Sequence, residues 1–308
     1  MMPTAAIDLH WVGHSRSIAS ALLRDNQVVA LIDPGPASTI STLREQLANF
    51  GIRIADLNFL LLTHIHLDHA GAAGLLVREN PKLQVYVHDR GAPHMIDPAK
   101  LLRSASRLYG DEMQRLYGDF LPVPQENLHA LQGGESISLG SRRLSVLYTP
   151  GHASHHVTFF DSSDGTAFVG DTAGISVNGH PYVLPATPPP DINFELWEQS
   201  LDAIEALHAQ RLFLTHFSFS DKPAAHLATY RERLRRWREL SGRILLSAAD
   251  ESAAMHRFAQ EAAAEAAQFL SPEDIGHYVF NGALNLSWLG LARYHRKRAE
   301  AENPTALQ

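Results

Sequence analysis

Short apolar segments separated by turn residues run through the first two-thirds of the chain. Such runs, bounded by glycine, proline, asparagine or aspartate, are typical of β-strands. The segments expected to be strands are Ala5–Val12, Gln27–Ile32, Asn58–Leu62, Leu83–Val87, Ser136–Leu139, Arg142–Tyr148, Val157–Phe160, Ala167–Val169 and Arg211–Leu214. Turn residues around Gly140 and over Asp161–Gly165 separate neighbouring strands at hairpin spacing, so they predict hairpins.

Helical spacing appears in other stretches. Apolar residues recur every three or four positions in Ser38–Phe50, which places them on one face of a helix. The region from about His94 to Leu128 is also helix-like and interrupts the strands as an insertion, whereas the prolines of residues 181–193 predict a stiff extended loop. Strand signals disappear beyond about residue 221, where the expected helices are Lys222–Leu240, Asp250–Leu270 and Pro272–Arg298.

These patterns predict a mixed α/β body over residues 1–220, with a helical insertion at about 94–128, and a helical region over residues 221–308. A length of 308 residues is enough for such a body with an appendage. The net charge of −7 argues against broad binding to nucleic acid or to an anionic membrane. The first residues lack a basic segment followed by an apolar run, and no stretch has the length of a membrane span, so we expect a cytoplasmic protein.

The chain contains 18 histidines and no cysteine. The absence of cysteine excludes disulfides, iron–sulfur clusters and thiolate zinc sites. Any transition-metal site must therefore use imidazole and carboxylate ligands.

One segment concentrates such ligands. His64, His66, Asp68 and His69 follow a predicted buried strand and precede a predicted helix, at the edge of a sheet where α/β proteins place their sites. In an irregular turn, residues two apart can face the same point. His64 and His66 can therefore face one ion while Asp68 and His69 face a second.

This segment resembles the H-x-H-x-D-H signature of the metallo-β-lactamase-fold hydrolases, and further signatures follow in the expected order. Tyr148–His152 resembles the strand that runs into a Gly-His turn, Phe168–Thr172 the strand that ends in Gly-Asp, and Leu212–His216 the strand that ends in histidine. The resemblance covers about residues 5–217. It implies an αββα sandwich of two mixed β-sheets flanked by helices.

The resemblance also implies two metal ions with Asp171 as the bridge between them. The first ion would be held by His64, His66 and His152. The second ion would be held by Asp68, His69 and His216. We expect two zinc ions, although iron or manganese also suits this donor set. Such ions would lower the pKa of a shared water. Asp68 is the predicted catalytic residue, because it can orient that water and relay its proton.

Residues beside the ligands are candidates for supporting roles. Asp33 resembles the early aspartate of the superfamily that props the metal loop without binding metal. Thr63, Thr149 and Thr215 lie just before or near ligands, so they are either hydrogen-bonding partners of the ligand loops or ordinary strand residues.

Substrate contacts are harder to read. The candidates, each with packing or surface exposure as the alternative, are Trp11, His14, Tyr109, Tyr117 and His155. The basic run Arg293–Arg298 either holds an anionic substrate or forms a solvated helix end. The expected partner is a small-molecule substrate, without nucleic acid or membrane, and a homodimer is left open.

The motif order and the helical C-terminal region resemble the glyoxalase II type, which implies a hydrolase acting on a thioester or ester. The absence of cysteine and the presence of Asp171 both disfavour a β-lactamase. The alternatives are a lactonase or phosphodiesterase of the same fold, a mononuclear iron oxygenase of the persulfide dioxygenase type using His64, His152 and Asp171, and a ligand-binding regulatory protein with little turnover.

Overall fold

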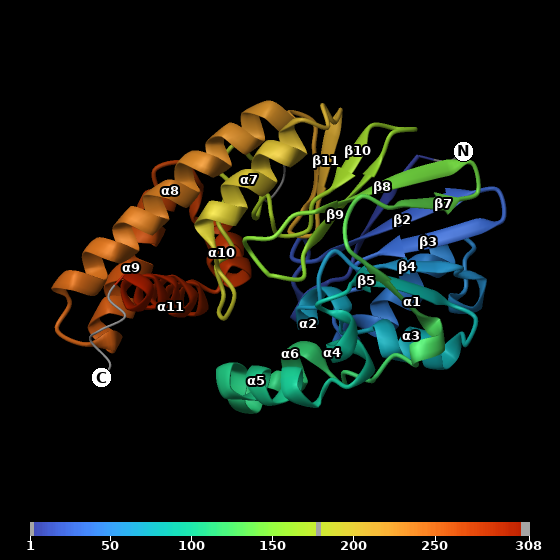
Figure 1. The fold of residues 1–308 in the computed structure, drawn as a ribbon, viewed down its shortest axis with the longest axis horizontal. Coiled ribbons are helices and arrows are strands. Elements are labelled where there is room, and N and C mark those ends of the chain that lie inside the picture. The colour runs from blue at the N-terminus through green and yellow to red at the C-terminus, as the bar shows by residue number, and fades with distance from the viewer. Residues whose placement is uncertain (1–2, 177–179, 303–308) are drawn as a thin grey trace.

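The computed structural model describes residues 3–176 and 180–302. Two six-stranded sheets pack against each other, with helices on their outer faces (Figure 1). The expected sandwich of two mixed sheets flanked by helices is confirmed, and helices follow it at the C-terminal end.

The first sheet has its strands in sequence order, β1-β2-β3-β4-β5-β6. Their bounds are β1 Ala5–Asp8, β2 Ala19–Asp25, β3 Val28–Ile32, β4 Phe59–Leu61, β5 Gln84–His88 and β6 Leu128–Leu131. Strands β3 to β6 are parallel, and the helices that connect them include α1 (Ile40–Asn49), α2 (Leu67–Ala70), α3 (Ala73–Glu79) and α4 (Ala92–Ile96). Parallel strands point their carboxyl ends to the same edge, so the loops after β3 and β4 meet there.

The second sheet has the order β12-β11-β10-β9-β8-β7. Its strands are β7 Ser136–Leu139, β8 Arg142–Tyr148, β9 Val157–Asp161, β10 Thr166–Phe168, β11 Arg211–Leu214 and β12 Ser218–Ser220. Only β10 and β11 pair in parallel, because the connection between them contains helix α7 (Phe194–Glu205).

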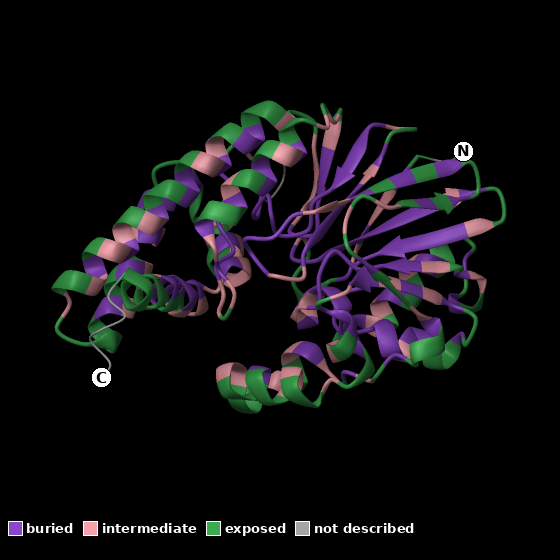
Figure 2. Ribbon diagram, in the orientation of Figure 1, coloured by how far each residue is buried: buried purple, intermediate pink, exposed green. Residues whose placement is uncertain are grey.

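Apolar side chains form three buried clusters. In Figure 2 buried residues dominate the strands of the sandwich and alternate with exposed ones along the helices. Leu61 of the first sheet meets Phe159 and Phe213 of the second between the sheets. Leu43 and Leu47 of α1 cover the outer face of the first sheet, since a helix buries its apolar stripe there.

The insertion after β5 contains α5 (Ala99–Tyr109) and α6 (Met113–Tyr117). Its last α-helix ends at Tyr117, earlier than the end near Leu128 that the sequence pattern predicts. Gly110 and Gly118 have φ of 52° and 68°, a region that favours glycine, and each follows the last turn of a helix. An extended segment then leads to β6.

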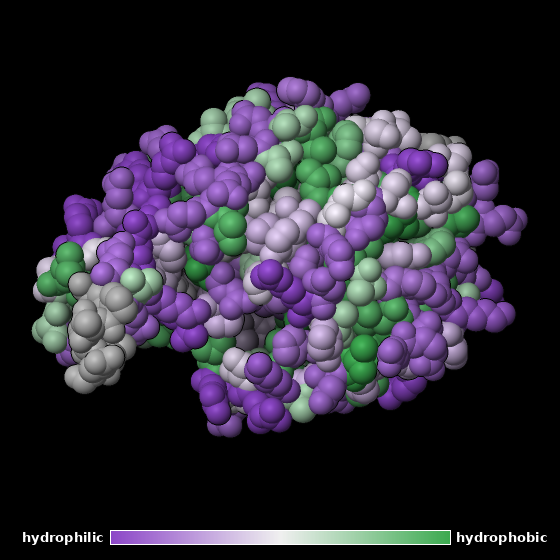
Figure 3. Space-filling view, viewed as in Figure 1, coloured by the Kyte–Doolittle hydropathy of each residue, from purple (hydrophilic) through white to green (hydrophobic). Residues whose placement is uncertain are grey.

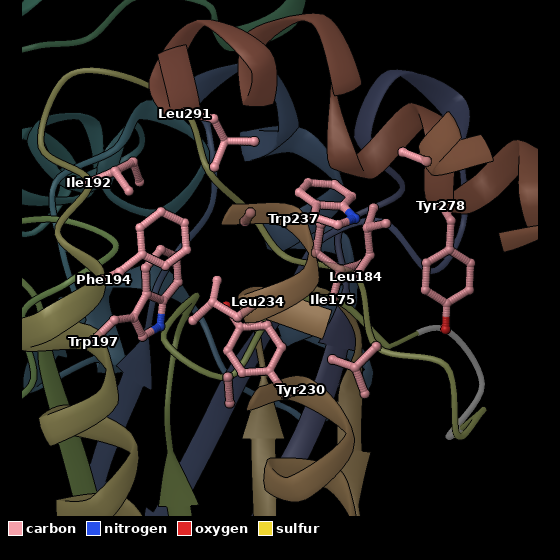
Figure 4. Packing of buried hydrophobic residues seen from close by; sticks show 14 of the residues in the cluster. Ile175, Leu184, Ile192, Phe194, Trp197, Tyr230, Leu234, Trp237, Tyr278 and Leu291 are labelled. Atoms are coloured by element: carbon pink, nitrogen blue, oxygen red, sulfur yellow. The ribbon is translucent and has the colours of Figure 1, made fainter. Parts of the chain in front are cut away.

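The C-terminal helices are α8 (Pro223–Ser247), α9 (Glu251–Ala266), α10 (Pro272–Gly282) and α11 (Leu284–Glu302). They pack on α7 and the second sheet through one continuous cluster of aromatic and aliphatic side chains (Figure 4). Trp197 of α7, Tyr230 and Trp237 of α8, and Leu291 of α11 all belong to it. The C-terminal helices, α7 and the second sheet therefore share one hydrophobic core.

Several details differ from the sequence prediction. The single helix predicted for Pro272–Arg298 is wrong: Ala283 adopts a left-handed conformation with φ of 39°, which ends α10 before α11 begins. The strand predicted to reach Val12 stops at Asp8, because His10 and Val12 have positive φ. The sequence pattern does not predict strand β2 or helix α7. Within the described residues, no helix is both long enough and apolar enough to cross a membrane.

Candidate metal centre

All seven predicted ligands lie at one edge of the sandwich, because each follows the end of a strand. The segment after β4 supplies His64, His66, Asp68 and His69. The turns after β8, β10 and β11 supply the remaining three, His152, Asp171 and His216. Among the described residues, the ligand atoms form three overlapping groups in which no two atoms are more than 4.8 Å apart: His64, His66 and His152; His64, His69 and Asp171; and Asp68, His69 and His216.

The first predicted set is made of imidazoles alone. His66 Nδ1 lies 3.0 Å from His64 Nε2 and 2.9 Å from His152 Nε2. Burial, together with the neighbouring imidazoles, lowers the pKa of His64 well below its usual value, and burial lowers the pKa of His66 to about 4. Both rings are therefore neutral at physiological pH and keep a lone pair, as metal ligation requires.

The second predicted set contains Asp68, His69 and His216. Asp68 Oδ2 lies 3.3 Å from His216 Nε2 and 3.9 Å from His69 Nε2. Burial alone would raise the pKa of Asp68, but the neighbouring His69 and His216 lower it to about 2, so the carboxylate is ionised at neutral pH.

Asp171 lies between the two sets and turns one oxygen toward each. Its Oδ1 lies 3.2 Å from His69 Nε2 and 3.6 Å from His216 Nε2, whereas its Oδ2 lies 3.5 Å from His152 Nε2. This is the arrangement that a carboxylate bridging two ions needs.

The buried polar atoms test whether a metal fits. His69 Nε2 and Asp171 Oδ1 are buried and lie 3.2 Å apart, and within the described residues neither atom has a partner with hydrogen-bond geometry. An unsatisfied buried polar atom costs about 1–3 kcal/mol. A cation between these atoms would satisfy both, and the nitrogen and oxygen donors suit zinc, iron or manganese. The residues therefore fit a metal.

A second layer of hydrogen bonds fixes several of the predicted ligands. The Asp33 carboxylate accepts from Thr63 N (2.8 Å), Thr63 Oγ1 (2.7 Å), Thr215 Oγ1 (3.0 Å) and His69 Nδ1 (2.8 Å). Asp33 thus joins two strand ends and turns His69 Nε2 toward Asp171.

The remaining ligand rings are held in the same way. His152 Nδ1 donates to the Ala186 carbonyl (2.8 Å), and His216 Nδ1 donates to the Ser17 carbonyl (2.7 Å). Because Nδ1 carries the proton in both rings, Nε2 is left as the free acceptor on the metal side.

His156 is a buried residue of the centre, whereas the sequence alone favours a flanking or surface position for it. Its Nε2 accepts a hydrogen bond from Asp171 N (3.3 Å), and its Nδ1 lies 3.0 Å from Thr149 Oγ1. Its ring stacks on His64 with centroids 5.0 Å apart. Thr149 therefore reaches the centre through His156 rather than directly. The only sequence signal for this role is that His156 lies four residues after His152. His155 lies just as near, so the sequence does not tell the two histidines apart.

Gly170 allows this close packing. It has φ of 46°, and a Cβ there would lie 2.6 Å from both His156 Nε2 and Thr63 Oγ1. A side chain at this position would push Asp171 away from the ligand cluster, which explains the glycine before the aspartate.

A cavity of about 520 Å³ opens above the predicted ligands, between the insertion and the C-terminal helices, where the space-filling view is hollowed (Figure 3). Trp11, Tyr109, Tyr117 and His155 line it, together with His66, Asp68, Asp171 and His216. His14 is not among the lining residues. It is exposed and packs against Phe280, with ring centroids 4.4 Å apart.

The basic run on α11 is neutralised in part within the fold. Arg298 pairs with Glu195 and Glu302, and Arg296 pairs with Glu251. Arg293 instead donates to the Pro190 carbonyl, so only part of the positive charge of the run is paired.

Residues 16–216 match the family model of the metallo-beta-lactamase superfamily. The chain belongs to this superfamily. The metallo-beta-lactamase fold-containing protein ST1585 of Sulfurisphaera tokodaii is 31% identical over 179 residues, which cover 57% of this chain and 63% of that protein. The hydroxyacylglutathione hydrolase of Legionella pneumophila (strain Paris) is 29% identical over 150 residues, which cover 47% of this chain and 42% of that protein. The chain thus spans only part of these curated relatives.

Solved structures of superfamily members extend the likeness in fold. The Thermus thermophilus protein TTHA1429 superposes with a TM-score of 0.67 at 20% identity, covering 96% of this chain and 94% of that one. ST1585 superposes with a TM-score of 0.62 at 26% identity, covering 77% and 86%. At 20% identity the first shows the fold alone, and its coverage includes the C-terminal helices.

Proposed function

We propose that this chain is a hydrolase that holds two metal ions and cleaves a thioester or ester of a small molecule. The orientation of Asp171 carries the proposal. One of its oxygens faces His152 of the first set and the other faces His69 and His216 of the second, so a single carboxylate contacts both sets. A protein that bound one ion would have no use for a second complete set of donors.

Bound metal would supply a water acidified toward neutral pH and an electrophile for the carbonyl oxygen of the substrate. The residues of the chain do the rest. Asp171 contacts both sets of donors and keeps the distance between the two sets fixed. The hydrogen bonds of Asp33 hold His69 in the required tautomer.

Asp68 has a second task in this proposal. Its carboxylate lines the cavity directly beside His216. From there it can accept the proton of the attacking water and return it to the departing thiolate or alkoxide, which a general base at that position does.

Support for a thioester or ester comes from the hydroxyacylglutathione hydrolases, which match about half of this chain. The matched segment covers only 42–45% of those proteins. The acyl-transfer chemistry is therefore proposed here, and glutathione as the thiol is not.

The test combines metal analysis with a substrate panel. Purified protein, reconstituted with zinc, iron or manganese, is assayed for metal content and for hydrolysis of acyl thioesters, an aryl ester, a lactone, a phosphodiester and a chromogenic cephalosporin. We expect two metals per chain and thioester or ester turnover. Dominant phosphodiester turnover would overturn the substrate class. One iron per chain with oxygen consumption would instead favour the iron oxygenase.

A further inference from the structure

The cavity above the predicted metal centre has two chemically different ends. His216 of the second ligand set donates to the Ser17 carbonyl (2.7 Å), and the adjacent Arg16 carbonyl accepts from Asn281 (3.4 Å), the neighbour of Phe280, which places Phe280 on the side of the second set. The ring of His155 lies 5.6 Å from that of His66, which places His155 on the side of the first set. A substrate lying across the centre therefore meets different surroundings at its two ends.

The end beside Asp68 has an aromatic wall, defined here as Trp11, Tyr109, Tyr117 and Phe280. Trp11 contacts Tyr117 and Phe280 with ring centroids 5.8 Å and 5.2 Å apart, and Tyr109 and Tyr117 are 4.8 Å apart. Four separate segments thus form one continuous apolar surface. Aliphatic lining residues extend it, namely Leu101, Ala105, Leu108, Leu116, Ala283 and Leu286.

Polar contacts at its rim hold the aromatic wall in place. Trp11 Nε1 donates to the Leu116 carbonyl (2.6 Å), which fixes the indole against the insertion. Asn281 Nδ2 donates to the Arg16 carbonyl (3.4 Å), which ties α10 to the loop that carries Trp11. The wall is therefore formed before any ligand binds, which lowers the entropic cost of filling it.

The opposite end is polar and continues into a second cavity of about 620 Å³. Arg90, Ser154 and Asp191 line both cavities, and Lys297 and Glu195 line only the second. Charges of both signs in this wider space suit a polar group that stays partly hydrated.

We propose that the substrate carries an apolar acyl group, aliphatic or aromatic, which lies against the aromatic wall while the polar leaving group extends toward Arg90 and the second cavity. This inference rests on the proposed function, because the scissile carbonyl must lie at the predicted metal centre between the two ends. It makes Phe280, which the C-terminal helices contribute, a residue that sets the preference for acyl length.

A series of acyl thioesters of the neutral thiol N-acetylcysteamine tests the proposal, since only the acyl group varies. The expected kcat/KM rises from acetyl through butyryl to octanoyl by about fourfold per methylene, until the wall is covered. Replacing Phe280→Ala is expected to lower the ratio of octanoyl to acetyl kcat/KM about tenfold. Phe280→Trp narrows the cavity instead and is expected to shift the preference to shorter chains.

Val279→Ala is the matched control. Val279 neighbours Phe280 on the same helix, is 40% exposed and does not line the cavity, so its replacement should leave the ratio unchanged. Acetyl and octanoyl thioesters cleaved with equal kcat/KM would overturn the inference. So would a Phe280→Ala variant that keeps its circular dichroism spectrum and its preference for octanoyl.

Binding of octanoate, measured by calorimetry on metal-free protein, separates failure of the inference from failure of the proposed function. If no thioester or ester is hydrolysed but octanoate binds at least tenfold more tightly to the wild type than to Phe280→Ala, the apolar site stands and the reaction is wrong. If thioesters are hydrolysed but octanoate binds both proteins equally, the reaction stands and the apolar site is wrong.

Discussion

The predicted metal centre and the aromatic wall line the same cavity, yet they are built in opposite ways. Every predicted ligand follows a strand of the sandwich, and the rings of His69, His152 and His216 are each fixed by a hydrogen bond to their second nitrogen. The wall comes from helix ends and a short turn at the periphery, and it is held by ring packing and by hydrogen bonds at its rim. In the proposed function, the reacting groups therefore lie on the rigid core, whereas the residues proposed to set the substrate preference lie on elements that can change without disturbing the core.

The largest effect should come from breaking the link between the two ligand sets. Asp171→Ala removes the carboxylate that faces both sets, so we expect bound metal to fall and kcat/KM to drop by roughly a thousandfold, about 4 kcal/mol. Metal analysis and steady-state kinetics measure this. Asp221→Ala, an exposed aspartate near the start of α8, is the control. Retention of both metal and activity in Asp171→Ala would remove the basis of the site.

A smaller effect is expected from changing Asp33, which supports the predicted ligands without being one of them. Asp33→Asn keeps the size of the side chain, and asparagine tolerates the positive φ of 51° at this position. The amide group nevertheless puts donors where Thr63, Thr215 and His69 already donate. We expect metal affinity to fall about 10–100-fold, measured by chelator competition, and stability to fall by about 2 kcal/mol. Unchanged affinity would show that the ligands do not depend on this support.

His156→Phe tests the support that His156 gives to Asp171. Phenylalanine can keep the stacking on His64, but it cannot accept the hydrogen bond from Asp171 N. A loss of about tenfold in kcat/KM is expected, because this hydrogen bond is lost together with the contacts of Nδ1 to Thr149 Oγ1 and Thr172 Oγ1. Thr149→Val, which removes one partner of His156 Nδ1, should give a still weaker loss in the same assay. A larger loss of kcat/KM in Thr149→Val than in His156→Phe would mean that His156 is not the residue that supports Asp171.

The same contrast explains what the sequence could predict. The clustering of the predicted ligands follows from the sequence because His64, His66, Asp68 and His69 lie within six residues, and the other three each come just after a recognisable strand. The strand ends are local features, so a pattern of neighbouring residues finds them.

The wall was predictable only in part. Trp11, Tyr109 and Tyr117 are candidates by residue type, but Phe280 is hidden in a helical pattern that runs unbroken from Pro272 to Arg298. The Asn281-Gly282 dipeptide just before the break at Ala283 is a turn signal, but the helical spacing on both sides hides it, and alanine itself is a strong helix former. Which helix face meets the cavity depends on that break.

The smallest expected effect belongs to a hydroxyl of the wall. The rings of Tyr117 and Tyr109 are 4.8 Å apart, and burial raises the pKa of both hydroxyls, that of Tyr109 to about 12, so both stay protonated at neutral pH. If the wall acts only through its apolar surface, Tyr117→Phe removes about 1 kcal/mol of stability and lowers kcat/KM for the octanoyl thioester by no more than about threefold. Thermal unfolding and the acyl series measure both quantities. Tyr117→Ala, in contrast, opens the wall and should lower the preference for octanoyl as Phe280→Ala does. A loss of about a hundredfold in Tyr117→Phe, with acyl preference intact, would mean that the hydroxyl takes part in the chemistry. The aromatic wall would then contribute both to the reaction and to the acyl preference, and the two regions could no longer be separated by role.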